Sequence, residues 1–176
     1  MSESSTKVRT RRPLLKRPAI RVALGVVVFF VAVALYLLQP WKLWIDEVVN
    51  EPAPGGNAQP VELARGELIR HEHETTGTVR VLQLADGSRV LRLENLDTTN
   101  GPVLKVVLSD AKVVSEKDGW HVFDDGKYID LGRLKGNKGS QNYTLPRDAD
   151  LDDYRSVSIW CDRFNVSFGA ATLTGG

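Results

Sequence analysis

Cysteine, methionine and histidine, on which much metal and redox chemistry depends, are scarce in this sequence. Its 176 residues include one cysteine, one methionine and three histidines. A single cysteine excludes an intramolecular disulfide, so a folded domain must be stabilised by its core. Because the only methionine is Met1, the thioether ligand of an ordinary blue-copper centre is missing. The motif C-x-x-C-H is absent as well, which excludes covalent attachment of a c-type haem.

The net charge of +1 conceals an uneven distribution. Residues 1–21 carry seven basic side chains against one acidic side chain, whereas the remainder carries 16 basic and 21 acidic residues. A mildly acidic body argues against a nucleic-acid partner, because phosphate binding needs a basic surface. The carboxylates form no pair suited to acid–base catalysis, and no signature of Ser-His-Asp chemistry occurs. The sequence therefore identifies no enzyme class.

A long apolar run predicts a transmembrane helix over residues 19–38. Twenty residues at about 1.5 Å per residue cover about 30 Å, the thickness of the hydrocarbon core. Trp41 and Trp44 follow in the positions of an interfacial aromatic belt. A basic arm, residues 1–18, precedes the run, so the positive-inside rule predicts a cytoplasmic N-terminus. We therefore predict a single-pass cell-membrane protein that contacts the lipid bilayer through residues 19–38, with its C-terminal domain outside the cytoplasm.

Two other interpretations of the N-terminal segment stay open. A cleaved signal peptide would need a shorter apolar region and small residues at a cleavage site, which residues 38–41 do not offer. Residues 10–16, T-R-R-P-L-L-K, resemble a twin-arginine export signal. Two arginines in so basic an arm are more simply explained as positive-inside charge, because the strongly apolar run is typical of a general-route anchor. An uncleaved anchor is the interpretation that the long apolar run favours.

The rest of the chain divides into a linker and a β-rich domain. Residues 39–60 form a juxtamembrane segment that ends in a Pro/Gly-rich stretch, typical of a semi-extended linker. Residues 61–176 contain short strand-forming runs between frequent turns, with Asp86-Gly87 as a hairpin signal. Shorter strands are expected over residues 120–123, 127–131 and 141–145. We predict an all-β extracytoplasmic domain, an antiparallel β-sandwich or partly closed barrel, preceded by one transmembrane helix.

The cysteine lies in the most strand-like stretch of the chain, residues 156–173. From Val157 to Cys161, apolar residues alternate with other residues at the period of a half-buried strand. After residues 162–163 the apolar residues continue on the opposite parity, beginning with Phe164. A change of phase needs a bulge or a bend, and we favour one of these over a two-residue hairpin. Cys161 is thus predicted at a strand irregularity.

Two interpretations of Cys161 are open. A free cysteine is often a small buried hydrophobe, so Cys161 can be core packing beside Ile159. A lone thiol outside the cytoplasm is exposed to oxidation unless it is protected or used. Arg163 is expected to lower the pKa of the thiol and to favour the reactive thiolate. Trp160 and Phe164 are expected to contribute to the core, and the pattern leaves open whether Trp160 or Cys161 faces inward.

The three histidines are candidate partners of the thiol. His71 and His73 form an H-x-H pair, which on a strand would place both imidazoles on one face. With His121 and Cys161 they would supply ligands suited to copper, zinc or haem iron. The acidic neighbours of the pair fit a solvent-facing strand equally well. Because the spacing matches no zinc motif, we assign no metal ligands.

Several segments resemble the DM-thirteen domain. The terminal motif I-W-C-D-R-F-N-V-S-F-G-A-A-T-L covers residues 159–173. The segments upstream, in the family's order, are H-E-T-T-G-T-V (73–79), L-E-N-L-D-T-T-N-G-P (93–102), D-L-G-R-L-K-G-N-K-G-S-Q-N-Y-T-L-P (130–146) and Y-R-S-V (154–157). Together they span residues 66–173, nearly the whole predicted domain. One departure is Val103, where the family usually has an acid after Gly-Pro.

The resemblance implies an electron-transfer module. The family's lone cysteine, proposed to act as a naked thiol or as a ligand to a prosthetic group such as haem, corresponds to Cys161. We therefore expect a membrane-anchored redox module that uses Cys161, with His73 as the second participant and candidate cofactor ligand. The sequence requires no cofactor, although haem or a metal is compatible with it, and it does not identify the redox or protein partner. The alternative is a non-catalytic interaction or structural β-sandwich in which Cys161 is core packing.

Overall fold

The protein, seen in a computed structural model, forms two compact units, residues 1–39 and 40–176. The structure describes residues 18–40, 45–56 and 58–175.

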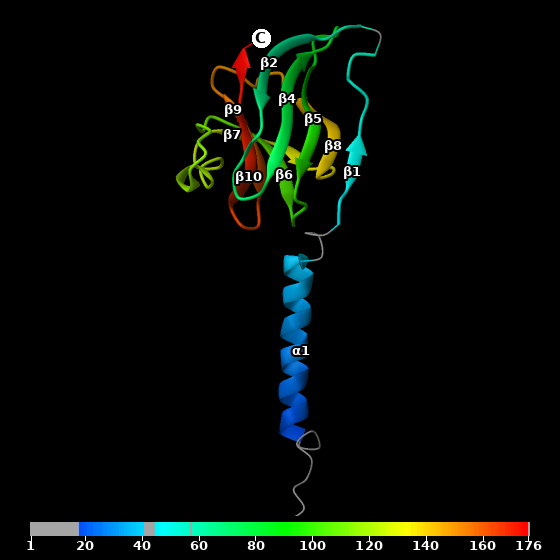
Figure 1. The fold of residues 1–176 in the computed structure, drawn as a ribbon, viewed down its shortest axis with the longest axis vertical. Helices are drawn as coiled ribbons and strands as arrows, with labels where there is room; N and C mark the ends of the chain where they lie inside the picture. Colours follow the sequence, from blue (N-terminus) through cyan, green and yellow to red (C-terminus); the bar gives the residue numbers. More distant parts are fainter. Residues whose placement is uncertain (1–17, 41–44, 57, 176) are drawn as a thin grey trace, which may run out of the picture. The chain divides into compact units, whose positions relative to one another are not determined.

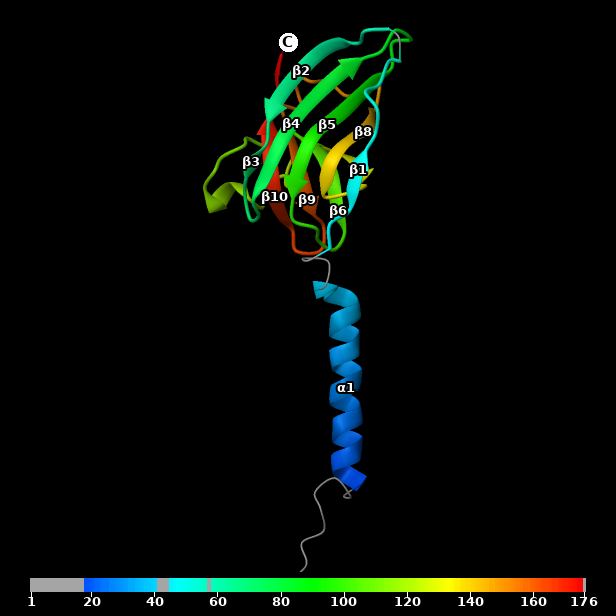
Figure 2. The ribbon, with the colours of Figure 1, turned by 45° about the vertical axis from the view of Figure 1, so that its right-hand side comes forward.

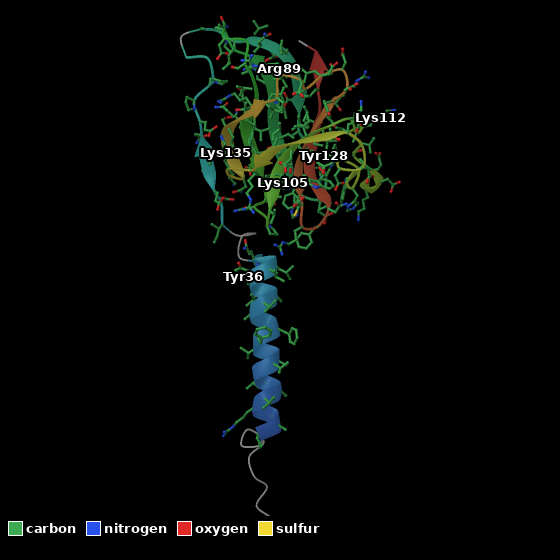
Figure 3. All side chains as sticks on the ribbon, turned by 180° about the vertical axis from the view of Figure 1, so that it is seen from behind. Tyr36, Arg89, Lys105, Lys112, Tyr128 and Lys135 are labelled. Carbon is green, nitrogen blue, oxygen red and sulfur yellow. The ribbon has the colours of Figure 1, made fainter. Side chains whose placement is uncertain are left out.

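The first unit contains one helix, α1, which spans Pro18–Leu38 (Figure 1). It begins one residue before the predicted segment 19–38. The mean hydropathy of its most apolar window is 2.5, and its 21 residues at about 1.5 Å each are long enough to cross a bilayer. Its side chains, such as Tyr36 in Figure 3, point outward and none is buried. Length and composition therefore make α1 a candidate membrane span. Residues 1–17 of the predicted arm and the tryptophans Trp41 and Trp44 lie outside the described residues.

The second unit is built from two sheets that face each other. In the first sheet the spatial order is β1-β8-β5-β4-β2-β11. Figure 2 shows β1, β8, β5, β4 and β2 side by side. The bounds are β1 Val48–Asn50, β2 Val61–Glu67, β4 Thr75–Gln83, β5 Arg89–Thr98, β8 Lys138–Leu145 and β11 Thr174–Gly175. β4 and β5 form the hairpin that the Asp-Gly signal predicts. All neighbours are antiparallel except β1 and β8, which are parallel.

The second sheet has the order β3-β10-β9-β6-β7, and all of its pairs are antiparallel. The bounds are β3 Ile69–Arg70, β6 Leu104–Ser109, β7 Tyr128–Arg133, β9 Ser156–Cys161 and β10 Val166–Thr172. Because the two sheets stay separate, the domain is a β-sandwich rather than a closed barrel, which confirms the all-β prediction and decides between its two forms.

Apolar side chains from both sheets meet between the layers. Val79 and Leu91 of the first sheet and Leu108 and Ile159 of the second are fully buried there. A second apolar cluster lies on the other face of the second sheet, where it is covered by residues 110–127. This segment, yellow-green in Figure 1, contains a short 3-10 helix, η3 (Lys117–Gly119). The predicted strand over residues 120–123 is therefore wrong, since these residues form turns within the covering segment.

Every residue of β9 is buried because the strand is covered on both faces. Cys161 belongs to the cluster between the sheets, whereas Trp160 belongs to the outer cluster with Phe123 and is 3% exposed. Both residues thus face inward, toward different apolar layers. Phe164 is 52% exposed, so the expectation that it contributes to the core is wrong.

The phase change after Cys161 arises from a reversal of the chain. Cys161 pairs with Val166, so β9 and β10 form a hairpin with the four-residue connection 162–165. The amide of Phe164 donates to the carbonyl of Cys161 over 3.2 Å and closes this turn. The connection is longer than a two-residue hairpin turn, as expected, but the predicted bulge or bend is wrong at this point, because residues 162–165 form the turn of a hairpin between two strands. A true register shift lies further on, between Ser167 and Gly169.

The segment expected to be a linker contains β1. Side chains attach β1 and the residues on either side of it to the rest of the domain, and we call residues 45–52 the strap. Asp46 pairs with Lys138 at 3.1 Å, and Glu51 pairs with Lys135 at 2.6 Å. The strap therefore packs along the edge of the first sheet, where it adds an edge strand that the Pro/Gly-rich composition does not predict.

Candidate functional site

Cys161 ends β9, and its side chain is fully buried in the sandwich core. Its register partners are the core residues Leu104 on β6 and Val166 on β10. The thiol donates a hydrogen bond to the backbone carbonyl of Pro102, with Sγ and O 3.4 Å apart. The sulfur is therefore enclosed by its neighbouring strands and by the segment that precedes β6.

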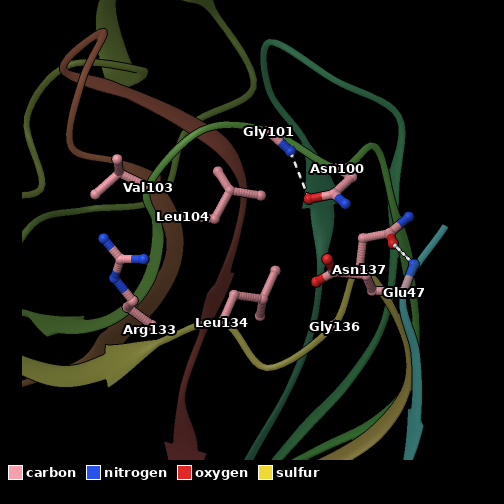
Figure 4. Close-up of a pocket in the computed structure, with 9 residues that line it drawn as sticks. All are labelled: Glu47, Asn100, Gly101, Val103, Leu104, Arg133, Leu134, Gly136 and Asn137. Carbon is pink, nitrogen blue, oxygen red and sulfur yellow. Dashed lines mark hydrogen bonds between the residues drawn. The ribbon is translucent and has the colours of Figure 1, made fainter. Parts of the chain in front are cut away.

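A short loop, residues 100–103, completes this enclosure, and we call it the cover loop. The backbone amide of Asp162 donates to the carbonyl of Val103 over 3.3 Å. Gly101 packs so closely on Phe168 that a Cβ at this position would lie 2.9 Å from the ring Cζ. Figure 4 shows Gly101 and Val103 on the loop beside a small cavity of about 40 Å³. Contacts at several points thus hold the loop over the thiol.

Val103 has a backbone conformation that is unusual for its residue type. Its φ angle is +58°, in the left-handed region. A β-branched side chain is disfavoured there, and such conformations cost about 1–3 kcal/mol and persist only where surrounding contacts enforce them. The hydrogen bonds on either side of Val103 provide that enforcement. The cover loop therefore carries backbone strain next to the only cysteine.

The environment of Cys161 favours the neutral thiol. Burial raises the pKa of Cys161, and it is the largest influence. The backbone amides of Phe164 and Arg163 and the charge of Arg163 oppose this rise, while Asp162 adds to it. The expectation that Arg163 would make Cys161 a ready thiolate is therefore wrong for the closed domain, because the loss of hydration outweighs the nearby positive charge.

His73 lies near the same loop through an aromatic contact. Its ring packs on Phe168 with the centroids 3.9 Å apart and the planes at 39°. Phe168 in turn contacts Gly101 of the cover loop. Burial lowers the pKa of His73, an effect that Glu72 partly opposes, so the imidazole is mainly neutral at pH 7. Phe168 thus connects His73 to the loop that covers Cys161.

His71 points into a different layer. Its Nδ1 is 2.8 Å from the Ser167 hydroxyl, which also accepts a hydrogen bond from Ser158 over 2.9 Å. The ring packs among aromatic side chains of the covering segment, with Trp120 at 6.2 Å and Phe123 at 5.8 Å between centroids. The prediction that both imidazoles of the H-x-H pair share a face is wrong, because residues 71–73 form bends rather than a strand.

The remaining histidine does not join the thiol either. His121 is exposed, and its Nδ1 lies 2.6 Å from the carbonyl oxygen of Asn165 in the β9–β10 turn. Within residues 18–40, 45–56 and 58–175 there is no group of three or more His, Cys, Asp or Glu side chains placed to hold a metal ion. The four-residue ligand set considered from the sequence is therefore not assembled in this structure.

Three sequence-distant segments converge at the site. Residues 73–79 supply Thr75, whose hydroxyl donates to the carbonyl of Phe168 over 3.0 Å. The same hydroxyl lies 2.8 Å from that of Thr98, which precedes the cover loop. The C-terminal hairpin supplies Phe168 and the cysteine itself. The strands thus gather these segments around Cys161 and its cover.

Comparison with known proteins identifies the domain. The sequence model described as Electron transfer DM13 matches residues 67–173, more than half of the chain. The chain belongs to this family. No curated protein and no solved structure matches it. Membership in this family associates the domain with electron transfer, and the match itself names no residue that performs it.

A haem does not fit beside Cys161 in this DM13 domain. Pockets for ligands of that class are about 300–1,000 Å³, whereas the cavity beside the cover loop is about 40 Å³. Four larger hollows of about 360–510 Å³ lie elsewhere, and neither Cys161 nor His73 lines them. The Sγ atom already donates to Pro102 and has no exposed surface. As far as the described residues show, the closed domain therefore offers a prosthetic group neither the space nor the free sulfur ligand that it would need at Cys161.

Local sequence patterns do not reveal the residues that enclose the thiol. Asn100 and Pro102 are 61 and 59 positions before Cys161, too far for any local pattern to relate them. The sequence does contain one signal that this segment matters. The motif N-G-P ends a segment that resembles the family, and it is followed by Val103 where the family usually has an acidic residue. Strand pairing brings that segment to Cys161.

Proposed function

We propose that the protein is a membrane-anchored, extracytoplasmic redox module whose working group is the naked thiol of Cys161. The observation that carries this proposal is the enclosure of the only cysteine beneath a strained loop, at the meeting point of the family-matched segments. A neutral, enclosed thiol is protected from casual oxidation, because the thiolate is the form that reacts. Opening of the cover loop would hydrate the sulfur and allow it to ionise.

A lone thiol supports a two-electron cycle. With a hydroperoxide as oxidant, the thiolate sulfur forms an S–O bond as the O–O bond breaks, and the leaving oxygen takes a proton. A dithiol partner would then reduce the sulfenic acid to the thiol, release one water and become a disulfide. His73, whose ring contacts Phe168 beside the cover loop, is proposed as the group that relays the thiol proton to water when the loop opens.

The membrane location is part of the proposal. The length and hydropathy of α1 support a single membrane-spanning helix. Seven basic side chains within residues 1–21 support a cytoplasmic N-terminus under the positive-inside rule. On this topology the DM13 domain lies outside the cytoplasm, where an unprotected thiol would be at risk. Protease treatment of intact cells should remove the domain, and a protected domain would contradict the topology.

Substitution of the cysteine tests the redox role. Full-length protein in detergent is treated with hydrogen peroxide at low ratio, and intact mass is recorded with and without a dithiol. We expect a gain of one oxygen that the dithiol reverses. Cys161→Ser should show neither change, and it should be destabilised by about 1–3 kcal/mol at most, because its hydroxyl can donate to the carbonyl of Pro102. A native thiol that oxidises only after the domain unfolds would refute the redox role.

Core packing is the second candidate function for Cys161. It is favoured by the complete burial of the side chain between Leu104 and Val166. Under this alternative the domain is an interaction or structural module. Cys161→Ala would then reduce stability and leave the redox properties of the protein unchanged. The peroxide experiment separates the two candidates, since packing alone gives no reversible oxidation of the native state.

A further inference from the structure

A continuous series of contacts joins the strap to the thiol. The Asn100 side-chain amide donates through Nδ2 to the carbonyl of Ile45 over 3.1 Å, and its Oδ1 accepts from the amide of Gly101 over 2.9 Å. The next residue, Pro102, accepts the hydrogen bond of Cys161. Asn100 is 7% exposed, so little water competes for these bonds. The buried side chain of Asn100 therefore connects Ile45, the first residue of the strap, with the backbone of the cover loop.

A second buried asparagine fixes the strap beside the start of the cover loop. The amide of Glu47 donates to Oδ1 of Asn137 over 2.7 Å, and Nδ2 of Asn137 donates to Oδ1 of Asp46 over 2.8 Å. The same Nδ2 donates to the carbonyl of Thr98 over 2.7 Å. Asn137 is 1% exposed. Figure 4 shows Asn100 and Asn137 beside the small cavity, each with its dashed bond.

Two features of the cover loop would favour a change of conformation on loss of these contacts. Val103 is strained at φ +58°, so the loop has a local reason to leave its closed form. The adjoining cavity of about 40 Å³ leaves space beside Val103 and Leu104 that a close-packed core would fill. The loop contains only four residues, so its movement need not disturb the sheets. Contacts from the strap and from Asp162 keep it closed.

We propose that residues 45–47 of the strap control access to the Cys161 thiol through Asn100. While these residues are docked, Asn100 holds the cover loop in its strained form and the sulfur is enclosed. When they are released, Val103 relaxes out of the left-handed region and the thiol becomes accessible. The inference deepens the proposed function, since it concerns regulation of the same thiol. The test of this inference measures the accessibility of the Cys161 thiol and does not depend on whether the thiol can be oxidised reversibly.

Paired substitutions within the strap provide the test. Asp46→Ala removes the ion pair with Lys138 and the bond from Asn137, beside the cover loop. Glu51→Ala is the matched control, because it also removes one lysine pair and one hydrogen bond but at the far end of the strap. Full-length protein in detergent is reacted with an aromatic disulfide reagent, which forms a mixed disulfide with the thiol and releases a coloured thiolate. Because the chain has one cysteine, the signal reports Cys161 alone.

The expected changes in the labelling rate of Cys161 differ among the variants in direction as well as in size. Asn100→Ala removes two buried hydrogen bonds and should label at least about tenfold faster than the wild type. Asp46→Ala should label a few-fold faster, and Glu51→Ala should stay within about twofold. Val103→Gly should label about fivefold more slowly, since glycine occupies the left-handed region without strain. This last variant keeps the test decisive if Asn100→Ala folds poorly.

Two results would overturn the inference. One is equal acceleration by Asp46→Ala and Glu51→Ala, which would mean that any loosening of the domain exposes the thiol. The other is a labelling rate in Val103→Gly that equals or exceeds that of the wild type. A low dependence of the rate on urea would support local opening, and a dependence as steep as that of global unfolding would count against it. Faster labelling without reversible peroxide oxidation would support the gate and refute the redox function.

Discussion

Two titratable side chains, Cys161 at the end of β9 and His71 in the bend after β3, are buried beneath covers of very different construction. Cys161 lies under the four-residue cover loop, which is held by hydrogen bonds and contains one strained residue. His71 lies under residues 110–127, which pack Phe123 and Trp120 against it. Apolar packing over a wide area opens only with much of the structure, whereas a few hydrogen bonds can open locally. Both side chains are fully buried, and the cover of Cys161 depends on fewer apolar contacts than that of His71, so the proposed opening would expose the thiol more readily than the histidine.

Removal of packing from the outer layer should give the largest effect. Trp160→Ala deletes a side chain that is 3% exposed and in edge contact with Phe123. We expect a loss of about 3–5 kcal/mol of unfolding free energy, as for other aromatic-to-alanine changes in cores. Thermal melting followed by circular dichroism measures it. Phe164→Ala is the control, because its 52% exposed ring should cost less than about 0.5 kcal/mol. Equal losses in the two variants would show that the outer layer is not tightly packed.

The sequence predicts the framework of the domain better than its covers. The β4–β5 hairpin follows from Asp86-Gly87 between alternating runs, which are local signals. β1 could not be predicted in this way, because Val48–Asn50 has no pattern of its own and becomes a strand by pairing with β8. Periodicity also fails on β9, since a strand covered on both faces buries polar residues such as Ser158 along with its apolar ones.

The candidate site shows the same limit. Cys161 attracts attention from composition alone, because it is the only cysteine. Its enclosure depends on contacts with Pro102 and Val103, which strand pairing brings close from a remote part of the chain. The raised pKa of the thiol could not be predicted either, because it arises from burial and not from the neighbouring Arg163. Local sequence therefore identifies the candidate group, and tertiary structure determines its protonation state and its exposure.

A substitution in the cover loop should have an intermediate effect and should act on the thiol. Gly101→Ala would place a Cβ 2.9 Å from the Phe168 ring, so the loop or the ring must move. Overpacking of this kind costs about 1–3 kcal/mol. We also expect faster labelling of Cys161 in the native state. Gly175→Ala is the control, because a Cβ there meets no atom within 4 Å. A stable Gly101→Ala variant with unchanged labelling would contradict the tight closure of the loop.

The smallest effects concern the pH dependence of stability, and they should have opposite signs for the two buried groups. Burial lowers the pKa of His71 below its unfolded value of about 6.5, so the unfolded chain binds a proton that the folded domain excludes. The stability that the neutral His71 contributes is therefore present above about pH 6.5 and falls on acidification. Burial raises the pKa of Cys161 above its unfolded value of about 8.5, so stability falls as the pH rises past that value.

Single substitutions should separately reduce the loss of stability at acidic pH and the loss of stability at alkaline pH. Melting temperatures between pH 5 and 9.5, measured under reducing conditions, should fall less steeply on the acid side in His71→Gln and less steeply on the alkaline side in Cys161→Ala. His121→Gln, which replaces an exposed histidine, is the control for the acid side. The pKa of His73 is also lowered by burial, so His73→Gln should remove a further part of the decline in stability on the acid side. If Cys161→Ala keeps the full alkaline decline, the folded domain does not hold the thiol neutral, and the local protection on which the redox proposal rests is absent.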